Sequence, residues 1–122
     1  MAYLRIALQL IVAFGVLNVW LLRADKPTPY RGGDARNIRE EFANYGLPVP
    51  VMFLVGAIKI LLALALIAGI WIPQLVQPAA IGLGVMMLGA MAMHLKIKDP
   101  LMKALPSFSV LVLCAVIAFL PA

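Results

Sequence analysis

The sequence predicts an all-α membrane protein: a four-helix transmembrane bundle with a short amphipathic interfacial helix between its first two spans. Three observations support this fold class. The 122 residues are 65% hydrophobic and 12% charged, whereas soluble domains average about half apolar and about a quarter charged residues. Four apolar runs are long enough to cross a bilayer, which takes about 20 helical residues. Most charged residues gather in the connections between these runs.

The four spans are expected at residues 3–22, 51–72, 79–95 and 105–120 of a single domain, residues 1–122. No small-residue cleavage site follows the first run, so we expect a retained helix and not a signal peptide. Trp20 at its end is typical of an interfacial anchor. Pro73 and Pro78 bracket the turn before the third span. Pro106 opens the fourth, at a position where a helix tolerates proline.

The connection between the first two spans, residues 23–50, is long for a helical bundle and should contain a helix of its own. We expect this helix at about residues 34–45, because Asp34 is a good N-cap and Gly46 is a good stop signal. Glu41 lies at the edge of its apolar stripe, so its carboxylate turns toward the membrane side and needs a cation. The stripe itself, which favours a helix lying along the membrane face, consists of Ala35, Ile38, Phe42 and Tyr45.

The basic residues predict the orientation of the bundle. The formal net charge of +5 raises the question of nucleic-acid binding, but the cations stand beside helix ends, and membrane topology explains them better. Eight of the ten lie in residues 23–50 and 96–103. The positive-inside rule therefore places these two segments in the cytoplasm and both termini outside. We expect the bacterial inner (plasma) membrane and no nucleic-acid partner.

Lys59 is the most informative residue of the chain. It lies inside the second span, about 12 Å from the start of that helix at about 1.5 Å per residue. A cation near mid-membrane costs about 3 kcal/mol even on lenient insertion scales, so such residues usually face a bundle interior or a wet cavity. Gly56 and Ala63 share its helix face, and small residues there allow a close helix approach. A site lysine and a structural ion pair remain open as its roles.

Other polar residues fall in the same half of the bundle as Lys59. Asn18 lies one turn from the end of the first span, His94 ends the third, and Glu41 lies in the amphipathic helix. We expect Glu41 as the first hydrogen-bond partner of Lys59 and Asn18 as the second, with His94 at the mouth of the same cavity. Gln9 lies opposite Asn18 on the first helix at about 100° per residue, so one of the two should face away from the bundle core.

The sequence shows no evident cofactor motif. One histidine and one cysteine, without a second ligand cluster, predict no metal site. No P-loop, dinucleotide fingerprint or nucleophile elbow occurs in the chain. Cys114 is the only cysteine and lies in an apolar run, where a packing role is expected.

Several short motifs follow one another along the chain. They are Glu40–Phe42 with Tyr45–Pro48, then Val55–Ile60, then His94–Pro100, and finally Pro106. In order and spacing they resemble the DoxX-like family of small four-helix membrane proteins. The resemblance implies a four-helix bundle and links the chain to membrane redox assemblies, including thiosulfate:quinone oxidoreduction, or to assembly chaperones. It implies no particular reaction. The positions it marks as functionally interesting are Glu41, Gly56, Lys59, His94 and Asp99.

Three functions remain open. We favour a non-enzymatic accessory subunit or ligand- or lipid-binding module, with a polar cluster in the cytoplasmic half of the bundle. The second is a membrane enzyme or oxidoreductase component acting on a quinone or another lipid-soluble substrate, with Lys59 as acid or base and Glu41 and His94 assisting. A small exporter is the weakest. Besides the bilayer, protein subunits and a second copy of the chain are open as partners. The polar cluster consists of Asn18, Glu41, Gly56, Lys59, His94 and Asp99.

Overall fold

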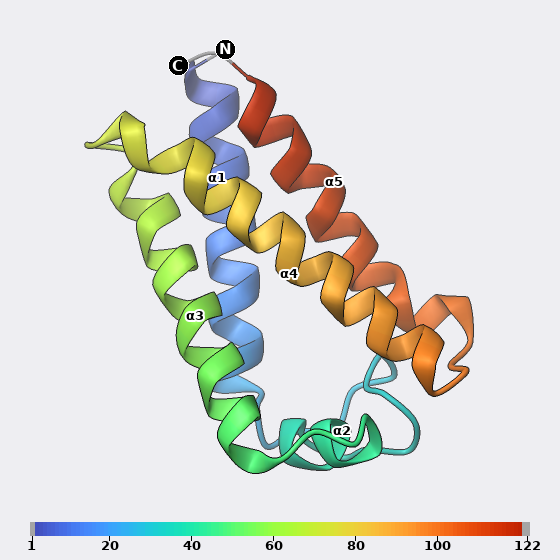
Figure 1. The fold of residues 1–122 in the computed structure, drawn as a ribbon. Coiled ribbons are helices and arrows are strands. Elements are labelled where there is room, and N and C mark those ends of the chain that lie inside the picture. The colour runs from blue at the N-terminus through green and yellow to red at the C-terminus, as the bar shows by residue number, and fades with distance from the viewer. Residues whose placement is uncertain (1, 121–122) are drawn as a thin grey trace.

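The structure, a computed structural model, describes residues 2–120 and confirms the predicted all-α fold. Four of its helical segments are long and apolar enough to cross a membrane (Figure 1). The first is α1 (Ala2–Leu17), continued by the π-helical η1 (Asn18–Leu22), and the second is α3 (Val49–Ala68). The third is η2 (Pro73–Leu75) with α4 (Val76–Lys96), and the fourth is η3 (Leu101–Ala104) with α5 (Leu105–Phe119). The short α2 (Ile38–Asn44) lies in the connection between the first two.

The helices pack as two pairs, α1 with α3 and α4 with α5. Figure 1 shows that these pairs meet near the end of the molecule where α1 starts and α5 finishes. They diverge toward the opposite end, which α2 covers. The bundle is therefore closed at one end and splayed at the other.

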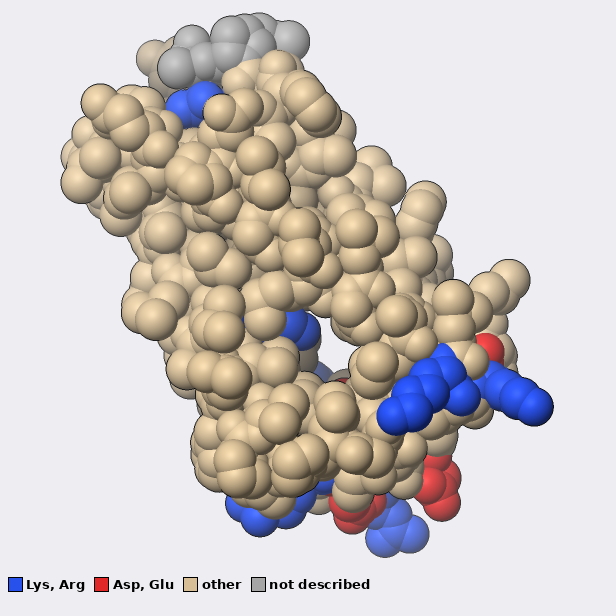
Figure 2. All heavy atoms as spheres, in the orientation of Figure 1, with Lys and Arg blue, Asp and Glu red and all other residues tan. Residues whose placement is uncertain are grey.

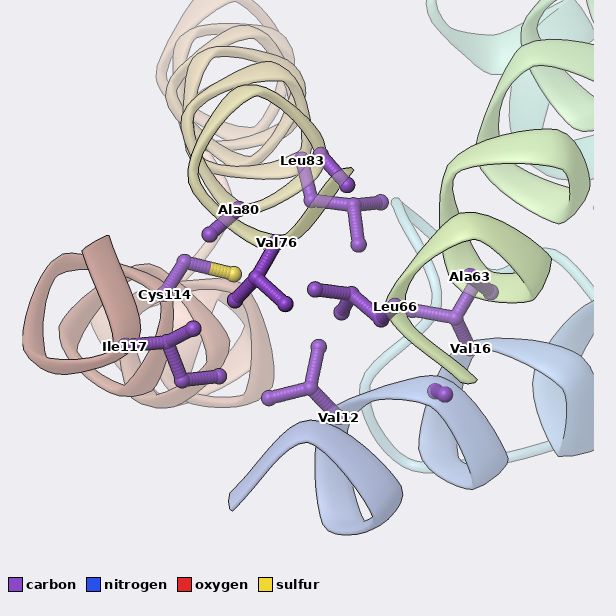
Figure 3. Close-up of a cluster of buried hydrophobic side chains, with 11 residues drawn as sticks. Val12, Val16, Ala63, Leu66, Val76, Ala80, Leu83, Cys114 and Ile117 are labelled. Atoms are coloured by element: carbon purple, nitrogen blue, oxygen red, sulfur yellow. The ribbon is translucent and has the colours of Figure 1, made fainter. Parts of the chain in front are cut away.

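The hydrophobic core lies where the two pairs meet. Its largest side chains come from all four long helices and point toward one another (Figure 3). Each is at most 2% exposed, which fits the close packing of protein interiors. These side chains are Val12, Leu66, Val76, Leu83 and Ile117.

Gln9 is the polar residue of this packed end. It is fully buried, and its Nε2 donates to the carbonyl oxygen of Leu66 at 2.8 Å. That carbonyl is free because the amide of Ile70 bonds the carbonyl of Ile67 instead, at 3.1 Å, as α3 ends. Asn18, on the opposite side of the first span, is exposed and lies away from this packed core.

The amphipathic helix is shorter than predicted. It begins at Ile38 with Asn37 as its N-cap, whose Oδ1 accepts from the amide of Glu40 at 2.8 Å. The prediction of Asp34 as the cap was wrong, because the amide of Ile38 bonds the carbonyl of Ala24 at 2.9 Å and holds the preceding residues in turns. Phe42 is buried as expected. Local capping preference could not choose between two good caps three residues apart.

Candidate functional site

A cavity of about 550 Å³ lies between the diverging helix pairs, above α2. Figure 2 shows it as a hollow between α3 and α4, with lysine or arginine atoms on its wall. Most of the lining is apolar. Its polar lining includes Asn18, Arg31, Glu41, Tyr45, Lys59 and His94.

Trp20 shapes one wall of the cavity. It lies in the π-helical turn η1, where the amide of Arg23 reaches back five residues to the carbonyl of Asn18 at 2.9 Å. A single π turn changes the direction of the side chains that follow it, and such turns are frequent at functional sites. The indole lies against Gly56, where an added Cβ would stand 2.7 Å from the ring. The prediction that Gly56 marks a close approach is therefore confirmed, and the ring edge of Trp20 also packs on Phe42 with centroids 5.9 Å apart.

Lys59 lines the cavity beside Trp20. Its Nζ lies 5.4 Å from the centroid of the indole ring, a cation–π contact. No hydrogen bond or ion pair joins this amine to any residue from 2 to 120. The predicted hydrogen bond from Lys59 to Glu41 is therefore wrong, and the alternative bond to Asn18 is absent as well. Glu41 instead accepts from other donors at both of its oxygens.

Two of those donors, Arg31 and Gly32, lie in the connection that precedes α2, and the third, Tyr45, directly follows this helix. Glu41 Oε1 lies 3.4 Å from Nη1 of Arg31, while Oε2 accepts from the amide of Gly32 at 2.7 Å and from the hydroxyl of Tyr45 at 2.9 Å. Arg31 is 4% exposed, and it also donates through Nη2 to the carbonyl of Arg23 at 2.6 Å. The Arg31–Glu41 pair therefore fastens the connection to α2 and forms one wall of the cavity.

A second chain of hydrogen bonds continues from Tyr45 to the turn between α4 and α5. The hydroxyl of Tyr45 lies 3.5 Å from Nε2 of His94, and Nδ1 of His94 lies 2.7 Å from Oδ2 of Asp99. Oδ1 of Asp99 accepts from the amide of Gly33 at 3.0 Å and lies 3.9 Å from the amine of Lys103. This chain joins the first connection to the second across the open end of the bundle.

The protonation states follow from these contacts. Burial raises the pKa of Asp99, but the hydrogen bonds from His94 and Gly33 and the charge of Lys103 outweigh it, so this pKa lies below its usual range. Asp99 is then an acceptor, which assigns a hydrogen to Nδ1 of His94, while Nε2 of the same ring faces the hydroxyl of Tyr45. Burial, and then the charge of Glu41, raise the pKa of Tyr45, so its hydroxyl stays a donor.

Four of the six predicted residues therefore line one cavity. The other two do not line it but contact residues that do. Gly56 lies under Trp20, and Asp99 orients His94 from behind. The sequence analysis missed Arg31 as the cation of Glu41, because no local spacing distinguishes it from the other arginines of the connection. Within residues 2–120, no three His, Cys, Asp or Glu side chains are grouped as a metal site would require. The four residues on the cavity wall are Asn18, Glu41, Lys59 and His94.

Comparison with known proteins gives a family. A model of the DoxX-like family matches residues 32–119, which confirms the resemblance drawn from the motifs. With the four apolar helices, the match identifies an integral membrane protein. Neither the curated proteins nor the solved structures contain a match to the chain.

Proposed function

This chain belongs to the DoxX-like family, and we propose that it is a small membrane module that binds the polar head of a lipid or lipid-soluble molecule. One observation carries this proposal. The amine of Lys59 lies at membrane depth on a cavity wall, without a hydrogen-bonding partner among the residues described. A lysine that served only to lock the bundle would be paired with a carboxylate, because a lone cation in the membrane is unfavourable.

The shape and lining of the cavity support the same function. Its volume of about 550 Å³ falls in the range of small-molecule sites, about 300–1,000 Å³. It opens between α3 and α4, where lipid would surround the bundle. Met86, Met87 and Met93 form part of its wall, and flexible thioether side chains adapt to ligands of irregular shape.

One observation favours an enzyme as the second candidate. Asp99 orients His94, and the ring reaches the cavity wall, as a general base requires. In this alternative, His94 would exchange a proton with a lipid-soluble substrate such as a quinol, and Lys59 would donate to its oxygen. A binding module needs no such exchange, so the two candidates differ in whether His94 is required for function beyond binding.

Native mass spectrometry from mild detergent tests the binding function. We expect a lipid-sized adduct on the wild-type protein and its loss from Lys59→Met. The matched control is Lys98→Met, which removes the same charge from an exposed position outside the cavity and should retain the adduct. Equal adduct occupancy in all three proteins would contradict the proposal. The same spectra report a second copy of the chain or a partner subunit.

We also propose that the α2 end lies in the cytoplasm. Lysine and arginine side chains gather at this end of the molecule (Figure 2), which supports the positive-inside orientation. A reporter that is active only outside the cytoplasm should therefore work when fused after Ala122. Activity only of a cytoplasmic reporter at this position would reverse the orientation.

A further inference from the structure

We propose that the ligand of this cavity is anionic: a single-chain amphiphile whose carboxylate or phosphate head pairs with Lys59. The inference rests on the proposed binding function and adds the chemical class of the ligand. The charge on the cavity wall, the surroundings of Lys59 and the empty space beside two glycines each support it.

The cavity wall carries an excess of positive charge. Only one carboxylate, Glu41, lines the cavity among the described residues. Its oxygens accept from Arg31, the amide of Gly32 and the hydroxyl of Tyr45, and among the described residues its one ion pair is with Arg31. Arg31 pairs with Glu41 and Lys103 pairs with Asp99. A neutral ligand would leave Arg23 and Lys59 without an anion, whereas an anionic head would supply one. The four cations of the wall are Arg23, Arg31, Lys59 and Lys103.

Lys59 is the cation that a ligand inside the cavity would reach, because Arg23 is exposed at the end of the first span. The guanidinium of Arg31 donates hydrogen bonds to Glu41 and to backbone carbonyls, and the amine of Lys103 donates to the carbonyl of Gly33. Lys59 has the ring of Trp20 on one side, and an aromatic face compensates an ammonium without accepting its hydrogen bonds. An oxyanion would supply those acceptors.

Two glycines leave room for the chain of such a ligand. Gly15 on the first span and Gly89 on α4 both line the cavity, and a Cβ added at either would meet no atom within 4 Å. Gly84, on the same helix as Gly89 but nearer the packed end, would instead place its Cβ 3.5 Å from Leu111. At these glycines the free space therefore lies in the open half of the bundle, within a cavity of about 550 Å³.

Binding of matched amphiphiles to the full-length protein in a neutral detergent tests the inference. A Trp71→Phe background leaves Trp20 as the sole fluorophore, because the chain has two tryptophans, and Trp71 is exposed. We expect dodecanoate and dodecyl phosphate to change the Trp20 emission saturably, and dodecanol and a decyl-substituted quinone to bind at least tenfold more weakly. Acetate and inorganic phosphate, which lack the chain, should bind at least tenfold more weakly as well.

Variants assign the effect to the head group. Lys59→Met should weaken the two anionic amphiphiles at least tenfold and leave dodecanol unchanged, while Lys59→Arg should retain binding of the anions. Lys98→Met should bind like the parent. Dodecanol or the quinone binding as tightly as dodecanoate would overturn the anionic class while leaving the binding function intact. If acetate or phosphate bound as tightly as the amphiphiles, the ligand would not need a hydrocarbon chain, and that part of the inference would be overturned. Absence of all binding would overturn both proposals.

Discussion

The two ends of this bundle differ in how the same four helices use their space. At the end where α1 starts, side chains such as Leu66 and Val76 fill the interior completely and are 0% exposed. At the α2 end the helix pairs separate and enclose a cavity of about 550 Å³. The difference teaches that close packing and free space are divided along the length of this bundle. The packed end holds the helices together, which leaves the open end room for the ligand that we propose.

Polar residues follow the same division. In the packed end, Gln9 makes one hydrogen bond that ties the first span to α3. In the open end, where the two helix pairs separate, chains of hydrogen bonds connect them instead. Glu41 and Asp99 are the centres of these chains: Glu41 accepts from three donors, and Asp99 accepts from two and pairs with Lys103. Lys59 takes part in neither, which separates the groups that hold the site from the group that would bind.

The largest effect is expected where the open end depends on a buried ion pair. Glu41→Ala strands Arg31, which is 4% exposed, together with the amide of Gly32. Breaking one partner of a buried pair costs about 3–5 kcal/mol in soluble proteins, so we expect a loss of this size in the free energy of unfolding in detergent. Glu40→Ala is the matched control, because Glu40 is exposed and accepts one exposed amide; about 1 kcal/mol is expected. Equal losses would mean that the pair does not hold the open end.

Two of the three glycines of α4, Gly84 and Gly89, compare the ends directly. Gly84→Leu should overpack the closed end, where Leu111 and Cys114 lie within 3.7 Å of an added Cβ, and lower the free energy of unfolding by about 1–3 kcal/mol. Gly89→Leu points into empty space and should leave stability unchanged or slightly raised, because leucine favours a helix over glycine. Thermal unfolding in detergent separates them. If Gly89→Leu proved the more destabilising variant, the cavity would not be empty.

A smaller, pH-dependent effect is expected at Asp99. Asp99→Asn should lower the free energy of unfolding by about 1–3 kcal/mol at neutral pH, since it removes the charged acceptor of His94 and Gly33. The pKa of Asp99 is lowered in the folded protein, so its stabilisation is fully present above its ordinary pKa of 3.8 and is lost as the pH falls through the lowered folded value.

The difference between the wild type and Asp99→Asn should therefore shrink as the pH is lowered below 3.8. Chemical unfolding at a series of pH values measures it, with Asp34→Asn, at an exposed position, as the control. A difference that stays constant across this range would show that the carboxylate charge of Asp99 contributes nothing.

The packed end and the general position of the site could be predicted from the sequence. Apolar runs of sufficient length predict membrane-spanning helices. The small residues Gly56 and Ala63 predicted that Lys59 faces the bundle interior, and it does line the cavity there. These predictions depend on periodicity within one helix. The resemblance to the DoxX-like family rested likewise on short, contiguous motifs.

The contacts of the open end could not be predicted in this way, because distant segments make them. The π turn that redirects Trp20 depends on its packing against Gly56 and Phe42. Arg31 reaches Glu41 only because the connection is held by long-range bonds, such as the one from the amide of Gly33 to Asp99. A carboxylate in need of a cation was inferred correctly, but the sequence offered several cations and no spacing that selected one.

The smallest effect on stability is expected at Lys59, although its effect on binding should be the largest. Lys59→Met forfeits the cation–π contact with Trp20, which is worth about 0.5–2 kcal/mol. It also removes a cation from membrane depth, which recovers about 3 kcal/mol on the insertion scale. These changes oppose each other, so the melting temperature should stay the same or rise while ligand binding is lost. A loss of stability as large as that of Glu41→Ala would make Lys59 a structural residue of the open end. The proposed division, in which Glu41 and Asp99 stabilise the open end and Lys59 binds the ligand, would then be wrong.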